Sequence, residues 1–475
     1  MKDLSIKKVQ KIHALYYGGL VKTLGNPTLE NLAVFDLDRT NIENNFTLVK
    51  NEIETSDENA SLCIEYTSSF DLLALRLPPE DFFDWMKAGL TASYKLGYKA
   101  GEVYHLIGLG NAYWNLSEYS DAGDHYKEAL LIAEEIEFRE GQGLALGGLG
   151  NVYKNLGDYR QAIDYYLKAL KISGEDSYKQ GETLWLGALG VTYDSLGEYQ
   201  NAIKYLEDAL RISKEINDKQ RESLWTSGLG TAHLGLGNYR KSIEYFKDAL
   251  NICRNFGERQ REESYYLNGL GTAFWRLGDY QRSIAYYEEA IDLSGELFDR
   301  LSRCAALGNL GSVYRELKKY EKTIDYYEQA LLIAKEIGDK QGESTWTGNL
   351  GIVYFDLGKT DKAIEYYLQS LKISEEINFQ NGENSILEGL ANVYTSLGDY
   401  KKAFEYHEKA LKGVREIGDK DGEASVLTNM AMTYYSSEEN EKCLEYLKKA
   451  LHIFESIESP SSKTISLWIS EIENE

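Results

Sequence analysis

The stretch GQGLALGGLGNVYKNLGDYRQAIDYYLKAL, residues 141–170, decides the fold of this chain. In its second half, the small residues Ala162 and Ala169 and the large Tyr166 are spaced four and three residues apart, which places them on one face of a helix. The word LGDY at residues 156–159 separates this helix from an earlier one, because Gly caps helix ends and Asp begins helices. The stretch predicts two helices that are joined by a short turn and packed closely through small side chains.

The same pattern recurs with a period of 40 residues and one inserted residue before Gly271. Each copy carries a small residue in its first helix, which we call the repeat glycine: Gly110, Gly150, Gly190, Gly230, Gly271, Gly311, Gly351, Ala391 and Ala431. A small residue follows 12 positions later, a large and mostly aromatic one four positions after that, and Ala three positions further on, with Ser370 as the exception. The pattern explains why the chain has 37 Tyr and 42 Gly beside only 4 Pro.

One helix pair cannot bury its apolar face alone, so neighbouring pairs must stack into a solenoid with a continuous core. We therefore expect an all-α protein, an α-solenoid of about nine helix pairs. The predicted parts are a helical N-terminal region at 1–98 with a degenerate capping repeat, nine repeats at 99–457, and a C-terminal capping helix at 458–475. The capping repeat is proposed because residues 79–90 align with a second helix, with Gly89 in the place of Ala129.

This order of small, Leu-Gly, Tyr, Ala, aromatic and Ala positions resembles the tetratricopeptide repeat (TPR), whose usual length is 34 residues. The 40-residue unit is similar to the longer repeats of Pins/LGN proteins, kinesin light chains and bacterial and archaeal sensor proteins. It differs from the usual pattern in lacking the proline that closes each repeat. The resemblance implies a right-handed superhelix that binds proteins, with the first helix of each pair lining a concave groove.

Residues 1–100 resemble, more loosely, the helical region that precedes TPR arrays in NB-ARC (STAND)-type signalling NTPases. The resemblance lies in spaced words such as HALYY at 13–17, LDRTNIENNF at 37–46 and LALRL at 73–77. The sequence has no Gly-x-x-x-x-Gly-Lys-Ser/Thr phosphate-binding loop, so a nucleotide switch would have to be a separate polypeptide.

Charge and composition exclude several classes of protein. The net charge of −24 from 52 basic and 76 acidic residues repels phosphate backbones and anionic lipid, so we expect neither nucleic acid nor a membrane as partner. No run of 18 apolar residues and no signal-peptide pattern occurs, and the four cysteines are widely spaced. We expect a cytoplasmic protein with reduced thiols. The oligomeric state is left open.

The sequence offers no pattern typical of catalysis. Its six histidines are scattered, without His-Glu-x-x-His or His/Cys clusters, so we expect no metal and no cofactor. His233 and His407 replace aromatic residues of other repeats and are predicted core residues, as is Cys443. Carboxylates on solvated helix faces lack the shielding that shifts a pKa for acid–base work. We expect a protein that is not an enzyme.

Helical geometry selects the positions 6, 3 and 2 residues before the repeat glycine and 1, 4 and 5 after it as one stripe on the first helix. An Asn there can hold a peptide main chain through its paired donor and acceptor, and aromatic side chains can anchor a partner. The predicted groove residues are Asn111, Asn151, Asn309, Asn349, Asn392, Asn429, Tyr104, Trp114, Tyr265, Trp275, Arg276 and Arg315. Packing between repeats is an alternative role for the aromatic residues, and Trp185, Trp225 and Trp346 fall one step off the stripe and are predicted to be core.

Glycines are frequent along this stripe, and Gly inside a helix costs about 1 kcal/mol relative to Ala. They imply either tight stacking of helices, which we favour, or close approach of a ligand. The sequence thus predicts a non-catalytic interaction scaffold that binds a partner peptide or helix in its groove. The alternative is a sensor or regulatory subunit of an NB-ARC (STAND)-type signalling NTPase system. Nothing in the sequence names the partner.

Overall fold

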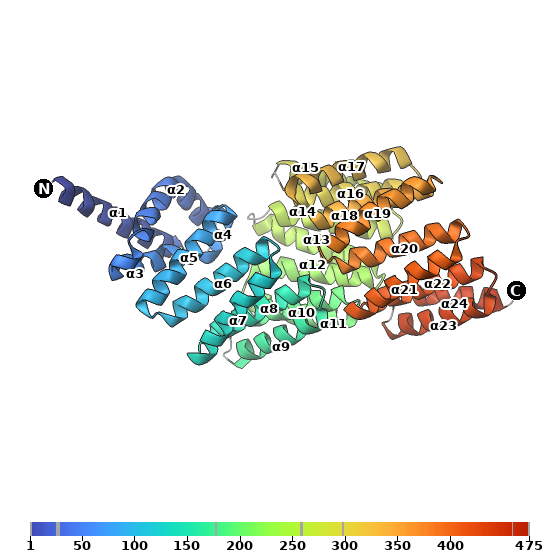
Figure 1. The fold of residues 1–475 in the computed structure, drawn as a ribbon, viewed down its shortest axis with the longest axis horizontal. Coiled ribbons are helices and arrows are strands. Elements are labelled where there is room, and N and C mark those ends of the chain that lie inside the picture. The colour runs from blue at the N-terminus through green and yellow to red at the C-terminus, as the bar shows by residue number, and fades with distance from the viewer. Residues whose placement is uncertain are drawn as a thin grey trace. The chain divides into compact units, whose positions relative to one another are not determined.

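The computed structural model describes residues 2–24, 29–175, 178–256, 260–296, 299–457 and 459–473. Within these ranges every regular element is a helix, and no strand occurs (Figure 1). The helices follow one another as consecutive packed pairs. The predicted all-α solenoid is confirmed.

The helices before the repeats are α1 (Lys2–Leu24), α2 (Leu29–Lys50), η1 (Ile53–Thr55), α3 (Asp57–Thr67), α4 (Phe70–Arg76) and α5 (Pro79–Leu96). The nine repeat pairs are α6 (Lys99–Asn115) with α7 (Tyr119–Glu135), α8 (Arg139–Asn155) with α9 (Tyr159–Glu175), α10 (Lys179–Ser195) with α11 (Tyr199–Glu215), α12 (Lys219–Gly235) with α13 (Tyr239–Phe256), α14 (Gln260–Arg276) with α15 (Tyr280–Glu296), α16 (Arg300–Glu316) with α17 (Tyr320–Ile337), α18 (Lys340–Asp356) with α19 (Thr360–Glu376), α20 (Gln380–Ser396) with α21 (Tyr400–Ile417), and α22 (Lys420–Ser436) with α23 (Asn440–Ser456). A last helix, α24 (Ser461–Glu473), follows them.

The chain divides into two compact units, residues 1–155 with 161–181, and residues 156–160 with 182–475. The first unit holds the N-terminal helices and the first repeats. Its core is aromatic: the rings of Phe46 and Trp85 stack with centroids 3.8 Å apart, and the buried Tyr66 hydroxyl donates a 3.0 Å hydrogen bond to the carbonyl oxygen of Ala14. The N-terminal helices therefore form a packed body with α5 and are not a loose extension of the array.

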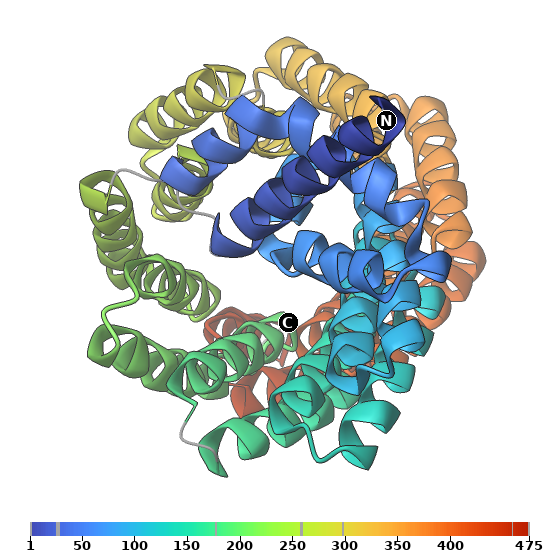
Figure 2. The same ribbon diagram turned by 90° about the vertical axis from the view of Figure 1, so that its left-hand side faces the viewer.

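In the second unit, the first helices of neighbouring repeats contact one another, as α14 does with α16 and α18 with α20. Figure 2 shows the helices of this unit following one another around a curved path. The first helices form the inner layer of this path and the second helices form the outer layer. The stripe selected from the sequence lies on this inner layer.

Aromatic pairs inside each repeat account for much of the tyrosine content. In most repeats, a ring three residues after the repeat glycine lies nearly parallel to a ring 12 residues further on, on the second helix, whereas in the first and last repeats the two planes are 45° apart. In the second unit, the centroids are 5.3 Å apart with planes 3° apart for Tyr193 and Tyr205, and 5.4 Å apart with planes 5° apart for Tyr314 and Tyr326. His233 takes part in the same stack at 5.3 Å from Tyr245, so the prediction that this histidine is a core residue is confirmed.

The glycines of the first helices are explained by a second aromatic position. In the second unit, the buried Tyr367 ring of α19 lies between Gly351 of its own repeat and Gly389 of the next one. A Cβ atom would stand only 3.0 Å from this ring at Gly351 and 2.7 Å from it at Gly389. The tight-stacking interpretation of these glycines is confirmed, because a ring occupies the space that a methyl group would need.

The turn inside each repeat uses a left-handed backbone residue. Glycine supplies it at most turns, for example Gly157 with a φ of 81° and Gly358 with a φ of 69°. Ser117, Lys318 and Glu438 adopt the same conformation without glycine's freedom, at φ of 62°, 55° and 63°. This conformation costs a residue other than glycine about 1–2 kcal/mol, so these three turns are expected to be less stable than the glycine turns.

The predicted C-terminal helix is present as α24, which buries Ile465 and Ile469 against the last repeat, next to Leu447 and Phe454. Glu458, Asn474 and Glu475, which belong to the predicted capping segment, lie outside the described residues. None of the described helices combines the length and the apolar character needed to cross a lipid bilayer.

Candidate functional site

Asn111 and Asn151, directly after the repeat glycine in α6 and α8, have the same side-chain partner. The Asn111 Oδ1 accepts a 2.6 Å hydrogen bond from the Tyr126 hydroxyl, and the Asn151 Oδ1 accepts one of 2.6 Å from Tyr166. Each amide oxygen thus connects the first helix to the buried ring of the second. In later repeats Thr272 and Ser312 bond the corresponding Tyr in the same way, at 2.8 and 2.9 Å.

The remaining predicted asparagines lie in the second unit. Asn309 and Asn349 stand two residues before the repeat glycine and are half-buried, whereas Asn392 is exposed. Within the described ranges, none of these three side chains has a hydrogen-bond partner. Asn429 differs, because its Nδ2 donates a 2.7 Å hydrogen bond to Glu388.

Glu388 is the centre of a buried polar network that the sequence reading missed. Its other oxygen lies 2.7 Å from Nδ1 of His407, whose Nε2 lies 3.0 Å from the Thr433 hydroxyl. His407 is fully buried, so the prediction that it is a core residue is confirmed. The sequence contained a signal for this network. His407 replaces the aromatic residue found at its position in most repeats, and Glu388 stands at a position that is Gly, Ser or Thr in several other repeats.

The predicted aromatic anchors of the first unit are half-buried. Tyr104 packs edge-on against Phe138 with centroids 5.3 Å apart, and burial together with the nearby Glu140 raises the pKa of its phenol. The Nε1 of Trp114 is buried and finds no hydrogen-bond partner in the described part of the chain. Both side chains are therefore partly buried by packing within the protein.

In the second unit, Tyr265 is 52% exposed, whereas Trp275 is half-buried with the Arg276 guanidinium 4.8 Å from its ring centroid. The structure thus brings the predicted Trp275 and Arg276 together as a cation–π pair. Arg315 is engaged elsewhere, because its Nε donates a 2.6 Å hydrogen bond to Asp356 in the next repeat.

A pocket of about 270 Å³ opens on the inner layer between α18 and α20. Asn349 lines it, together with Ser344, Thr345, Gly348, Ile352, Tyr367, Phe379, Asn381, Gly382, Ser385 and Ile386. All of these side chains are uncharged. At its rim, the Asn381 amide donates a 3.1 Å hydrogen bond to the hydroxyl of Tyr159, which belongs to the same unit.

Asp194 is a further inner-layer residue that the sequence reading missed, although it stands at the stripe position of Trp114 and Trp275. Burial raises the pKa of its carboxyl to about 7, and its Oδ1 has no hydrogen-bond partner among the described residues. The opposite effect is seen at the same position in α8, where burial lowers the pKa of Lys154. Both ionisable groups are therefore poorly hydrated, although they lie on the inner layer of the repeats.

The structure supplies no cluster for metal chemistry, since in the described ranges no three His, Cys, Asp or Glu side chains are placed to hold an ion. The described cysteines are free thiols, and burial raises the pKa of Cys63 to about 12 and also raises that of Cys443. Cys443 is fully buried, in agreement with its predicted place in the core.

Comparisons with known proteins show the family to which this chain belongs. A family model described as Tetratricopeptide repeat matches residues 101–175, 220–296, 302–376 and 383–456, and a second model of the same description matches 186–220. The first model covers more than half of the chain, so the protein belongs to the tetratricopeptide repeat family. Among curated proteins, none matches the sequence.

Solved structures share the fold at low identity. A Rap protein complexed with Competence and Sporulation Factor is 15% identical with a TM-score of 0.54, covering 76% of this chain and 99% of that one. A STAND (signal transduction ATPase with numerous domains) protein with a tetratricopeptide repeat sensor, from Pyrococcus horikoshii, is 17% identical with a TM-score of 0.50. That match covers 76% of this chain and 54% of the other.

Proposed function

We propose that the protein is a non-catalytic scaffold that binds an extended peptide segment of a partner protein along the inner layer of its repeats. The observation that carries the proposal is that the amides of Asn309, Asn349 and Asn392 in the second unit have no hydrogen-bond partner among the residues that the structure describes. The half-buried amides of Asn309 and Asn349 are not among the fully buried unpaired groups of the described residues, so a ligand can reach them. Together with the exposed Asn392, these two residues place three amides on successive first helices, whose donor and acceptor groups can bind a peptide main chain.

Two further observations support a peptide as the ligand. The pocket between α18 and α20 adjoins Asn349, so a side chain can be received where the main chain is held. The Rap protein of similar fold was solved in complex with Competence and Sporulation Factor, so a protein of this fold binds another molecule.

The test is selection of binding peptides from a displayed random library on the full chain, followed by affinity measurement. We expect the combined variant Asn309→Ala, Asn349→Ala and Asn392→Ala to bind at least about ten-fold more weakly, since each lost hydrogen bond is worth about 0.5–1.5 kcal/mol. The matched control removes three exposed amides from the second helices, Asn251, Gln329 and Gln369. Equal loss in both variants, or in neither, would refute a groove that works through its asparagines.

A second candidate function is that of a sensor subunit that acts on a separate NTPase. It is supported by the exposed apolar side chains of α1, where Ile12, Leu15 and Tyr16 are 55%, 46% and 61% exposed. Such side chains on one helix suit a docking partner. The test is co-purification of a nucleotide-binding protein from the native host with the full chain, and its loss in the variant Ile12→Glu, Tyr16→Glu. Co-purification that persists in this variant would remove α1 as the coupling surface.

A further inference from the structure

Two junctions between repeats share an internal tryptophan that the junction at α18 and α20 lacks. Trp225 of α12 lies over Gly187 of α10, and Trp346 of α18 lies over Gly308 of α16. In both cases, a Cβ atom on the glycine would overlap the indole ring. The glycine stands three residues before the repeat glycine of one repeat, and the tryptophan stands five residues before that of the next.

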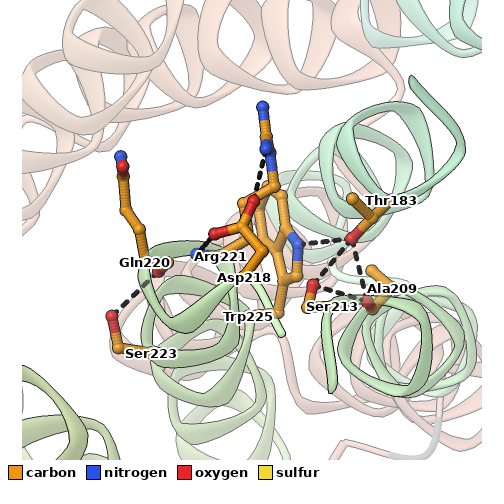
Figure 3. A network of polar contacts seen from close by, with 8 residues as sticks. All are labelled: Thr183, Ala209, Ser213, Asp218, Gln220, Arg221, Ser223 and Trp225. Carbon is orange, nitrogen blue, oxygen red and sulfur yellow. Dashed lines mark hydrogen bonds and ion pairs between the residues drawn. The ribbon is translucent and has the colours of Figure 1, made fainter. Parts of the chain in front are cut away.

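Each of these indoles is also held by a hydrogen bond. The Nε1 of Trp225 donates to Oγ1 of Thr183 at 3.0 Å, and Figure 3 shows this bond entering a network with Ala209 and Ser213. The Nε1 of Trp346 donates to Sγ of Cys304 at 3.0 Å. A third aromatic residue at this position, Tyr266, donates through its hydroxyl to Ser223 at 3.1 Å. For these three residues, the acceptor is the residue seven positions before the repeat glycine of the preceding repeat.

The junction between α18 and α20 has the same glycine position and hydrogen-bond acceptor position. Gly348 corresponds to Gly187 and Gly308, and Ser344 corresponds to Thr183 and Cys304. Ser344 is fully buried, and its hydroxyl lies 2.6 Å from Ser374 and 3.2 Å from the carbonyl oxygen of Ser370. Thr183 makes the equivalent contacts with Ser213 and the carbonyl oxygen of Ala209, each at 2.8 Å.

This junction lacks the tryptophan that would donate the hydrogen bond. The position of the two tryptophans is occupied by Ile386, which is too small to cover the glycine. A Cβ atom on Gly348 would meet nothing nearer than Ser370 Oγ at 3.2 Å and Ile386 Cγ1 at 3.6 Å. The pocket of about 270 Å³ opens here, lined by Ser344, Gly348 and Ile386 among others. It is several times larger than the roughly 30 Å³ that a water molecule takes up in the liquid.

We propose that this pocket binds the indole side chain of a tryptophan in a partner peptide. The ring lies over Gly348 and against Ile386 and Phe379, and its N–H donates to the Ser344 hydroxyl, as Trp225 and Trp346 donate at their own junctions. A hydroxyl that donates one hydrogen bond keeps lone pairs to accept another. Because all lining side chains are uncharged, the pocket selects a neutral aromatic group. The polar rim residues Thr345, Asn349 and Ser385 then face the peptide main chain.

This inference deepens the proposed peptide-binding function and rests on it. The probe is the pentapeptide acetyl-Gly-Gly-Trp-Gly-Gly-amide carrying 5-fluorotryptophan, followed by fluorine NMR because the protein has seven tryptophans of its own. We expect saturable binding to the full chain, at least ten-fold tighter than for the same peptide with Leu in place of Trp.

The decisive variant is Ile386→Trp, which fills the pocket from within as the two other junctions are filled. It should fold with an unchanged circular dichroism spectrum and a thermal midpoint no lower than the parent, and bind the probe at least ten-fold more weakly. Ile386→Leu, which conserves volume, is the matched control and should bind as the parent does. If Ile386→Trp does not fold, Gly348→Ala serves instead, because its methyl group would need only a shift of a few tenths of an ångström by Ser370 Oγ, 3.2 Å away, but would meet the ring of the probe.

Ser344→Ala tests the hydrogen bond. The parent should prefer the indole peptide over its 1-methylindole analogue by about two-fold to ten-fold, as loss of a bond worth about 0.5–1.5 kcal/mol implies, and the variant should not distinguish them. Absence of saturable binding to the parent, or equal binding to the parent and to Ile386→Trp, would overturn the inference. The same variants distinguish this inference from the groove function. If library peptides without Trp depend on the groove asparagines and bind Ile386→Trp as tightly as the parent, the groove function is supported and the indole pocket is refuted.

Discussion

The hydroxyl of Tyr166 donates a 2.6 Å hydrogen bond to the side-chain oxygen of Asn151, and Tyr126 makes the same bond with Asn111. The asparagine oxygen therefore holds a buried ring of its own repeat, while the residue belongs to the stripe on the first helix. A substitution of Asn at this position changes the fold and the groove together. This is why the asparagines at other positions, Asn309 and Asn349, are the better probes of binding.

We expect Tyr166→Phe to lower the free energy of unfolding by about 0.5–1.5 kcal/mol, the net value of one hydrogen bond. Asn151→Ala should cost more, about 1–3 kcal/mol, because it removes the acceptor of this bond while the phenol ring stays in the core. Urea unfolding followed by circular dichroism measures both. A cost for Asn151→Ala that is no greater than that for Tyr166→Phe would show that water replaces the lost amide.

Two glycines of α8 predict opposite effects of the same substitution. At Gly150 a Cβ atom would lie 2.5 Å from Cε1 of the buried Tyr166 ring, so Gly150→Ala should destabilise the protein by about 1–3 kcal/mol through overpacking. At Gly143 the nearest atom would be Cγ2 of Ile172 at 4.0 Å, and Gly143→Ala should stabilise by up to about 1 kcal/mol through helix propensity. Thermal unfolding of the two variants checks the pair. A loss of stability in both would mean that glycine serves a purpose in α8 other than receiving the ring.

Asp194 should make stability depend on pH. Burial raises the pKa of its carboxyl from 3.8 to about 7, so between about pH 4 and pH 7 the native state keeps a proton that the unfolded chain has lost. Stability from this group is therefore full at low pH and declines as pH rises towards 7. We expect Asp194→Asn to stabilise the protein by about 1–3 kcal/mol at pH 8 and to have little effect at pH 4.

The measurement is the difference in unfolding free energy between Asp194→Asn and the parent at several pH values, which cancels the titration of all other groups that the two share. A difference that stays constant from pH 4 to pH 8 would contradict the assigned cause, because an uncharged effect of the amide does not titrate.

The Glu388 network predicts strong coupling between two residues. His407→Leu should cost about 2–4 kcal/mol, because it leaves the Glu388 carboxylate without its histidine contact and Thr433 without the ring nitrogen. The double variant Glu388→Thr, His407→Leu copies the residues of the ninth repeat, Thr428 and Leu447, and should recover most of the lost stability. Additive costs in the double variant would show that the two side chains contribute independently.

The sequence by itself determined the solenoid. Its 40-residue period, its small residues and its Gly–Asp turns are local signals repeated nine times, so chance agreement is negligible and each helix is specified by its own residues. The same periodicity identified the core positions of His233, His407 and Cys443, because helical geometry fixes which residues share a face. The resemblance to the tetratricopeptide repeat implied that the first helices form the inner layer.

Only the tertiary structure decided which inner-layer residues remain available to a ligand. Asn151 and Asn349 are the same residue type on the same stripe, yet one amide is bonded to a ring of its own repeat and the other is not. Likewise, Gly348 does not differ in sequence from Gly308, but it becomes part of a pocket because the next repeat supplies Ile386 in place of Trp. Such differences arise where side chains of neighbouring repeats meet, since the space over one helix is set by the volume that the next one brings to it.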